Sequence, residues 1–262
     1  MKIAYAGFDL LAPALEALLK EGCQLVKLFT CPVDQEYEFN DQVIRLAEKA
    51  GAPWTSRPVA REDIRLLKEE GCDAFISAAY YYRIPVDHEL AMVNVHPSLL
   101  PQGRGAWPMP VQILRGEKQG GVTIHRLEED FDRGPILLQK AFTIRDGENL
   151  ETMTETIRSL LPDMMGELAA DFRGLYESAK PQGKGSYYPC PTEKDWTIGP
   201  DTEARQADRI LRAFYGFPCI YQEKGEARFE LVRGRLSRPK PGSLPVLGGW
   251  VEAETVKEIK TP

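Results

Sequence analysis

Strand-like and helix-like segments alternate along the first two thirds of the chain, and this alternation limits the folds open to it. Short apolar stretches typical of core strands lie at 2–6, 24–30, 73–79 and 92–96. Amphipathic stretches predict helices over 10–20, 41–50 and 62–70, with a short strand at 54–57. Short strand–helix–strand units predict a Rossmann-like, doubly wound, mainly parallel α/β sheet. Ligands of such sheets bind beyond the carboxyl ends of the strands.

The next part of the chain continues this pattern with longer elements. We expect strands at 121–126 and 136–144, followed by a helical tract over about 150–175. Pro162 lies inside that tract, and an internal proline removes one helical hydrogen bond. We therefore predict a kink or a split at Pro162.

The composition changes after residue 178. Residues 179–190 are rich in glycine and proline and predict a linker between a domain over 1–178 and a segment over 191–262. This last segment combines one amphipathic helix, at 202–214, with short strand candidates such as 227–232 and 249–252. We predict a small β-rich C-terminal subdomain. Its apolar face has to be covered, which suggests a homodimer through this segment.

Charge and cysteine content disfavour several classes of protein. The net charge of −6 disfavours a large nucleic-acid-binding face, because such faces rely on clustered lysine and arginine. No apolar run approaches the ~18 residues of a membrane span, and the N-terminus is typical of a core strand rather than a signal peptide. We expect a cytoplasmic protein without a membrane partner. Five scattered cysteines argue against a disulfide framework and a structural zinc site.

A candidate site follows the strand at 92–96. Asn94 and His96 are two residues apart, so a strand projects both side chains to the same face. The prolines and glycines from Pro97 to Pro108 predict a loop. A neutral amide beside a titratable imidazole suits oxyanion stabilisation and proton transfer. The pair also has a structural interpretation, in which Asn94 caps a turn and His96 is a strand-end histidine with its hydrogen bonds satisfied.

A second segment, 121–137, consists of a strand, an acidic loop and another strand. The loop can return a carboxylate beside His96, which would orient the imidazole and raise its pKa.

These motifs together resemble one enzyme family. They are Asn-x-His-Pro-Ser-Leu-Leu-Pro at 94–101, Arg-Gly-x-x-Pro at 104–108, Gly-Val-Thr-Ile-His at 121–125 and Asp-x-Gly-x-Ile-Leu at 132–137. The chain resembles the folate-dependent formyltransferases over about residues 1–178. This family includes methionyl-tRNA, glycinamide ribonucleotide and sugar N-formyltransferases. The resemblance implies the formyltransferase fold and the transfer of a formyl group from 10-formyltetrahydrofolate to an amine.

The resemblance also implies a catalytic triad of Asn94, His96 and Asp132, with Asp130 as the weaker alternative to Asp132. His96 takes a proton from the attacking amine, Asn94 stabilises the oxyanion, and Asp132 orients and tunes the imidazole. No metal is implied, because the formyl donor is already activated. His125 lies within a core strand pattern and is expected to be structural.

Further contacts are implied for the donor and the acceptor. The family holds the pterin between two loops, largely through backbone groups. The corresponding residues here are Tyr80, Tyr81, Tyr82, Arg83, Ile84, Glu128, Glu129 and Asp130. We expect the acceptor to contact Phe8, Arg104 and Trp107, with Arg104 meeting a phosphate and Trp107 a sugar or base. Ordinary loop packing explains Arg104 and Trp107 equally well.

Members of this family differ mainly in the amine acceptor. The tRNA-acting branch has a basic insertion after its second strand, whereas residues 31–41 here hold four acidic and no basic residues. A basic stretch at 228–240 argues the other way, although a solvated face also explains it. We expect a nucleotide-linked amino sugar formylated at a 4-amino group, of the kind used in surface-glycan or nonulosonic-acid pathways. Ala106 replaces a basic residue of the aminoarabinose enzyme, which puts that sugar in doubt.

Three alternatives remain open. One is a methionyl-tRNA, amino-acid or peptidyl formyltransferase. Another is a folate-binding protein without turnover, and a third is a hydrolase that releases formate. The intact Asn94, His96 and Asp132 argue against the binding protein, because binding alone does not need them.

Overall fold

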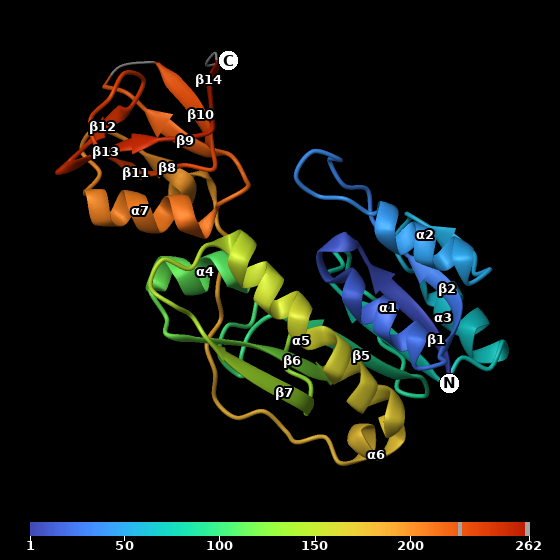
Figure 1. The fold of residues 1–262 in the computed structure, drawn as a ribbon. Helices are drawn as coiled ribbons and strands as arrows, with labels where there is room; N and C mark the ends of the chain where they lie inside the picture. Colours follow the sequence, from blue (N-terminus) through green and yellow to red (C-terminus); the bar gives the residue numbers. More distant parts are fainter. Residues whose placement is uncertain (225–226, 260–262) are drawn as a thin grey trace. The chain divides into compact units, whose positions relative to one another are not determined.

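A computed structural model of the chain describes residues 1–224 and 227–259. Its main feature is a seven-stranded sheet in the order β3-β2-β1-β4-β5-β6-β7 (Figure 1). The strands are β1 (Lys2–Gly7), β2 (Gln24–Phe29), β3 (Trp54–Thr55), β4 (Ala74–Ala78), β5 (Ala91–His96), β6 (Gln119–Arg126) and β7 (Ile136–Thr143). The first five strands pair in parallel, and β6 joins β5 antiparallel. The mainly parallel sheet predicted from the sequence is confirmed.

Helices cover both faces of this sheet. They are α1 (Ala12–Lys20), preceded by the short 3-10 turn η1 (Asp9–Leu11), then α2 (Asp41–Lys49) and α3 (Arg61–Glu69). The chain moves outward from β1 through β2 to β3 and then returns to β4. Right-handed crossovers therefore put α1 and α2 on one face and α3 on the other, as Figure 1 shows. The loops after β1, β4 and β5 consequently meet at one edge of the sheet.

The long helix α5 (Leu150–Ala170) continues through Pro162, so the predicted split at that proline is wrong. Its inward-facing side chains are fully buried, and this packing holds the helix together across the missing N–H group. The break comes instead at Asp171, which begins α6 (Phe172–Glu177) by accepting a hydrogen bond from Gly174 N at 3.1 Å. None of the helices in the described part of the chain is long and apolar enough to cross a membrane.

The chain divides into two compact units, each built from separate stretches. Unit 1 holds Met1–Arg104, Gly121–Phe142 and Glu155–Tyr187. Unit 2 holds Gly105–Gly120, Thr143–Thr154 and Tyr188–Pro262. One boundary falls inside the linker expected at 179–190. Two stretches from within the expected first domain nevertheless belong to unit 2.

The stretch 105–120 of unit 2 contains a helix that the sequence pattern did not predict. Residues up to Pro108 were expected to form a loop, but α4 (Pro108–Arg115) begins at that proline. It packs in unit 2 against α7 (Ala204–Ala213), which corresponds to the helix predicted at 202–214. The Arg209 guanidinium of α7 donates to the Leu114 carbonyl of α4 at 3.4 Å.

Unit 2 is otherwise rich in strands, as the sequence predicted. One sheet has the order β14-β10-β9-β8 and the other the order β11-β13-β12. The strands are β8 (Thr197–Ile198), β9 (Cys219–Gln222), β10 (Arg228–Val232), β11 (Arg235–Ser237), β12 (Leu244–Val246), β13 (Gly249–Glu252) and β14 (Thr255–Ile259), and the 3-10 turn η2 (Glu193–Trp196) precedes β8.

Candidate active site

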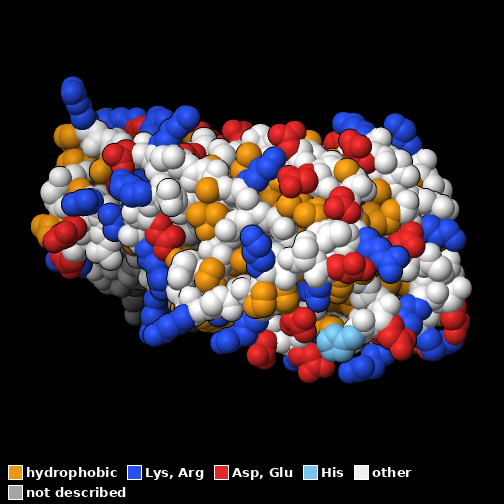
Figure 2. Space-filling model, turned by 90° about the horizontal axis from the view of Figure 1, so that it is seen from below, with side chains coloured by type: hydrophobic (Ala, Val, Ile, Leu, Met, Phe, Trp, Pro, Cys, Tyr) orange, Lys and Arg blue, Asp and Glu red, His pale blue; other side chains and the backbone are white. Residues whose placement is uncertain are grey.

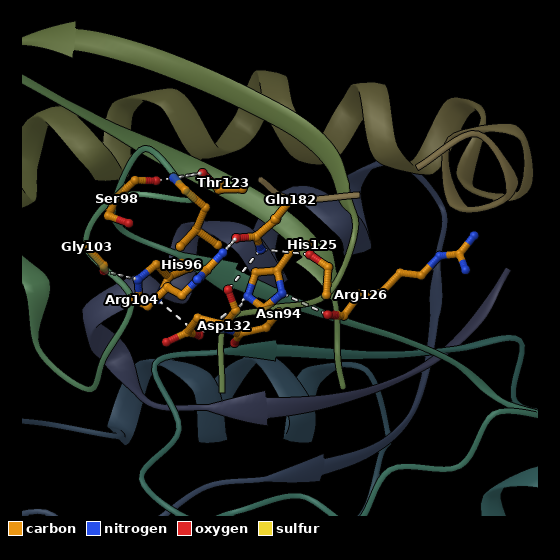
Figure 3. Close-up of polar contacts among 12 residues, drawn as sticks. Asn94, His96, Ser98, Gly103, Arg104, Thr123, His125, Arg126, Asp132 and Gln182 are labelled. Carbon is orange, nitrogen blue, oxygen red and sulfur yellow. Dashed lines mark hydrogen bonds and ion pairs between the residues drawn. The ribbon is translucent and has the colours of Figure 1, made fainter. Parts of the chain in front are cut away.

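The antiparallel pairing of β5 with β6 assembles the centre of the site. In this register Asn94 lies opposite His125, and His96 lies opposite Thr123. Side chains two residues apart on a strand share a face, so all four side chains lie on one face of the sheet. Figure 3 shows the side chains of Asn94, His96 and His125 directed toward Asp132, which comes from the loop after β6.

His96 is 4% exposed and contacts an acceptor through each ring nitrogen. Its Nε2 lies 2.8 Å from the carbonyl oxygen of Gly103, and its Nδ1 lies 3.5 Å from Asp132 Oδ1. A carbonyl oxygen only accepts, so Nε2 carries the hydrogen and the neutral ring has its lone pair on Nδ1. A proton taken up at Nδ1 would face the Asp132 carboxylate, which stabilises the imidazolium.

His125 fixes the orientation of Asn94. The His125 Nδ1 lies 2.8 Å from the carbonyl oxygen of Arg126, so in the neutral ring Nδ1 carries the hydrogen. Nε2 then accepts a hydrogen bond from the Asn94 Nδ2 amide at 3.2 Å. Because Nε2 is an acceptor, the nitrogen of the Asn94 amide faces His125, and its second N–H can donate elsewhere. The structural role expected for His125 agrees with these contacts, which place it beside Asn94.

The structure brings Asp132 beside His96, whereas Asp130 is exposed. Asp132 has a φ of 56°, a left-handed conformation that is uncommon outside glycine. Steric contact explains why the Asp-x-Gly motif needs a glycine. A Cβ on Gly134 would lie 1.9 Å from the carbonyl oxygen of Arg126. Only glycine allows the loop to approach the end of β6 this closely.

Burial is the main influence on the protonation of His96. It lowers the pKa of the imidazole, while the Asp132 charge and the Gly103 carbonyl oppose this effect and the nearby His125 adds to it. A lowered pKa keeps the ring neutral, and therefore able to accept a proton, down to a lower pH than an ordinary histidine with a pKa of about 6.5.

We therefore expect His96 to titrate below the usual histidine range, and kcat/KM to fall as the pH drops through that pKa. An NMR titration of the imidazole signals can test this, because the chain has only three histidines. In Asp132→Asn the opposing charge is lost, so the His96 pKa moves lower still. A His96 pKa above the ordinary range would show that the Asp132 charge outweighs burial.

The two loops expected to hold the pterin lie against each other. The Arg83 Nη2 donates to the Glu129 carbonyl at 2.9 Å, and the Arg83 guanidinium lies 5.7 Å from the centre of the Phe131 ring. Ile84 is buried in the core. Two tethered loops at the carboxyl edge of the sheet suit a planar, hydrogen-bonding ring system.

The three tyrosines of the first loop differ in environment. The Tyr80 hydroxyl accepts from Val59 N at 3.2 Å, and its ring meets Tyr82 edge-on at 5.6 Å. Tyr81 is more than half exposed and donates to the Glu38 carboxylate. Its ring lies 5.0 Å from that of Phe8, which is buried. Tyr81 is therefore the tyrosine of this loop most open to a ligand.

The other two residues expected at the acceptor have partners within the protein. The Arg104 side chain is 7% exposed, and it donates to Gln182 Oε1 and to the Gly183 carbonyl. Trp107, in unit 2, packs edge-on against Phe214 and Phe217 at 5.7 and 5.3 Å. These contacts match the packing alternative, and the substrate contacts of Phe8, Arg104 and Trp107 stay predictions.

Comparisons with known proteins agree with this fold. A family profile described as formyl transferase matches residues 7–167. The methionyl-tRNA formyltransferase of Thermodesulfovibrio yellowstonii is 29% identical over 232 residues, which are 84% of this chain and 75% of the relative. The match to the methionyl-tRNA formyltransferases of two Ehrlichia ruminantium strains, at 35% identity, spans half the length of those relatives.

Solved structures show the same fold at lower identity. A sugar N-formyltransferase from Shewanella has a TM-score of 0.71 and 19% identity, covering 92% of this chain and 98% of that chain. HypX from Aquifex aeolicus in complex with tetrahydrofolic acid has a TM-score of 0.72 and 15% identity, covering 99% of this chain and 44% of that chain.

The sheet, with an amide, an imidazole and a carboxylate brought together at its edge, defines a Rossmann-like α/β protein with a titratable cluster. With the profile match over more than half of its length, the chain belongs to the formyl transferase family. It is a formyl-transferring enzyme.

Proposed function

We propose that the protein transfers the formyl group of 10-formyltetrahydrofolate to a primary amine, and that Asn94, His96 and Asp132 carry out this transfer. The observation that carries the proposal is the convergence of these three side chains at the end of β5. His96 Nδ1 accepts the proton of the attacking amine, and Asp132 stabilises the resulting imidazolium. The Asn94 amide donates to the oxygen on which negative charge develops. The HypX complex with tetrahydrofolic acid supports a folate donor for this fold.

For the acceptor we favour the 4-amino group of a nucleotide-linked amino sugar over tRNA. The loop between β2 and α2 is acidic and ordered around its own carboxylates. Asp34 accepts backbone hydrogen bonds from residues 36–38, and Glu38 accepts from Tyr81. This loop and Tyr81 both follow carboxyl ends of parallel strands. An acidic loop there disfavours a long polyanion such as tRNA more than a small acceptor with only one or two phosphates.

The basic stretch 228–240 gives little support to a nucleic-acid face, because carboxylates pair with several of its cations. Arg228 pairs with Glu193 at 2.7 Å, Arg233 with Glu151 at 2.9 Å, and Arg235 with Glu252 at 2.7 Å. Lys240 also contacts Glu252. Acidic and basic side chains are likewise interspersed over much of the face in Figure 2. Nucleic-acid affinity depends on unpaired positive charge that can displace counterions.

The second candidate acceptor is methionyl-tRNA. The observation in its favour is that the curated relatives are named methionyl-tRNA formyltransferases.

The experiment that decides between them incubates the protein with 10-formyltetrahydrofolate and a panel of amines. The panel holds UDP-, dTDP- and GDP-linked amino sugars, glycinamide ribonucleotide and methionyl-tRNA, with tetrahydrofolate release and acceptor mass as the readouts. Formylation of one nucleotide sugar supports the proposal. Formylation of methionyl-tRNA overturns the acceptor, donor hydrolysis without an acceptor identifies a hydrolase, and no donor consumption overturns formyl transfer itself.

A further inference from the structure

Residues 180–187, here called the strap, lie across the loops that carry the active site. At one end Lys180 exchanges two backbone hydrogen bonds with Ile136, at 2.8 and 2.9 Å. At the other end the Ser186 carbonyl accepts from Arg104 N, and Ser186 N donates to the Pro101 carbonyl, both at 3.1 Å. The strap therefore bridges the loop after β5 and the start of β7. Composition alone predicts only a linker here.

Gln182 occupies the centre of the strap and uses both ends of its side-chain amide (Figure 3). Its Nε2 donates to the Asp132 carbonyl at 2.9 Å and to the Gly134 carbonyl at 2.8 Å. Its Oε1 accepts from the Arg104 Nε at 3.1 Å and Nη2 at 2.8 Å. A primary amide has two N–H donors and an oxygen with two lone pairs, so these four bonds use its full capacity.

The strap also reaches the other hydrogen-bond partner of His96. The Ser186 Oγ accepts from Gly103 N at 3.1 Å, and the Gly103 carbonyl contacts His96 Nε2. Gln182 holds the backbone of Asp132, whose carboxylate faces His96 Nδ1. Both ring nitrogens of His96 are thus connected to this one segment of the chain.

The conformation of the loop that carries Asp132 depends on hydrogen bonds such as those from Gln182. Asp132 adopts a left-handed φ of 56°, which is retained only where the surroundings enforce it. Its neighbours are exposed, including Phe131, whose side chain is 64% exposed, and Arg133. Gln182 donates hydrogen bonds to the carbonyls of Asp132 and Gly134, the residues on either side of Arg133. These bonds fix the part of the loop that carries the carboxylate.

We propose that Gln182 is a positioning residue for formyl transfer, which holds the Asp132 carboxylate close enough to His96 Nδ1 to stabilise the imidazolium. The inference rests on the proposed role of the triad. Arg104 acts through Gln182, because its guanidinium fixes the amide oxygen and thereby turns both amide hydrogens toward the Asp132 loop. This assigns Arg104 a second role besides the phosphate contact expected from the sequence.

Among the described residues, few charged or titratable groups lie near His96. The displacement of one of them should therefore change the His96 pKa measurably. Asp132 faces the ring from the loop after β6, and His125 faces it from β6 itself. Arg104 interacts electrostatically with Asp132 and with Arg133. Of these groups, only the carboxylate favours the imidazolium form of His96. If the carboxylate moves away while the ring stays buried, the His96 pKa falls.

The test is Gln182→Met, which keeps the length of the side chain and removes its hydrogen bonds. Gln206→Met is the matched control, at an exposed position of α7. We expect the His96 pKa, followed by NMR, to fall toward the value measured in Asp132→Asn. We also expect kcat to drop about 10-fold, with KM for donor and acceptor within about twofold, because misplaced catalytic groups slow the reaction more than they weaken binding. The control should change neither quantity.

A second variant covers the case in which Gln182→Met does not fold. Gln182→Glu keeps an acceptor for Arg104 but has no N–H for the carbonyls of Asp132 and Gly134, so its kcat should also fall about 10-fold. An unchanged kcat in Gln182→Glu, or an unchanged His96 pKa and kcat in a folded Gln182→Met, overturns the proposal. The NMR titration needs no turnover. If the wild-type protein transferred no formyl group, the proposed function would fail. The effect of Gln182→Met on the His96 pKa could still be measured.

Discussion

Replacement of His96 by alanine is expected to lower kcat for formyl transfer about 10³-fold, because general acid–base groups typically contribute 10²- to 10⁴-fold. His96 is the buried imidazole whose Nδ1 lone pair faces a carboxylate at 3.5 Å, and Gly103 holds its other nitrogen. Alanine removes the proposed proton acceptor and leaves the loops proposed to bind the donor in place. The measurement is single-turnover formyl transfer with the acceptor that the panel identifies.

His88→Ala is the matched control for this prediction. His88 is exposed and lies outside the cluster, so its loss should leave kcat within about twofold. The affinity of His96→Ala for tetrahydrofolate, measured by calorimetry, should stay close to that of the wild type. If His96→Ala retained most of its kcat, water or another group would be the base, and the assignment of His96 would be wrong.

The main sheet could be predicted because its strands are short apolar runs that differ clearly from the amphipathic helices between them. The errors come from proline. The sequence predicts a loop up to Pro108, yet this proline is the first residue of α4, where the missing N–H has no helical partner to lose. At Pro162 a kink or a split was expected, and the helix is not split there. In both cases the effect depends on position in the helix and on tertiary packing, which local sequence does not show.

The sequence predicts the part of the candidate site that depends on local patterns and motifs, and not the part that depends on tertiary contacts. Asn94 and His96 follow from the two-residue period of a strand, and Asp132 from a family motif. The role of His125 requires the antiparallel register of β5 and β6, which places it opposite Asn94. Gln182 lies 50 residues from Asp132 along the chain, in a stretch whose composition predicts only a linker. Contacts of that separation depend on the folded path of the chain.

Replacement of Asn94 by alanine is expected to lower kcat about 10²- to 10³-fold, the usual loss when one oxyanion donor is removed. His125 Nε2 accepts one Asn94 amide hydrogen at 3.2 Å, so the amide nitrogen is fixed and the second hydrogen is directed by the same contact. The hydrogen bond from the Asn94 amide strengthens only as negative charge develops on the oxygen in the transition state. KM should therefore change little. Steady-state kinetics with both substrates varied checks this split.

The Asn94→Asp variant distinguishes hydrogen-bond donation by the Asn94 amide from the space that its side chain fills. The carboxylate has nearly the size of the amide, but at neutral pH it only accepts, so it faces the lone pair of His125 Nε2 and repels developing negative charge. Its kcat should therefore be no higher than that of Asn94→Ala, although it fills the same space. If Asn94→Asp were the more active variant, steric positioning would be the main contribution of Asn94. A lower or equal kcat, with KM preserved, identifies the amide N–H as the group that stabilises the oxyanion.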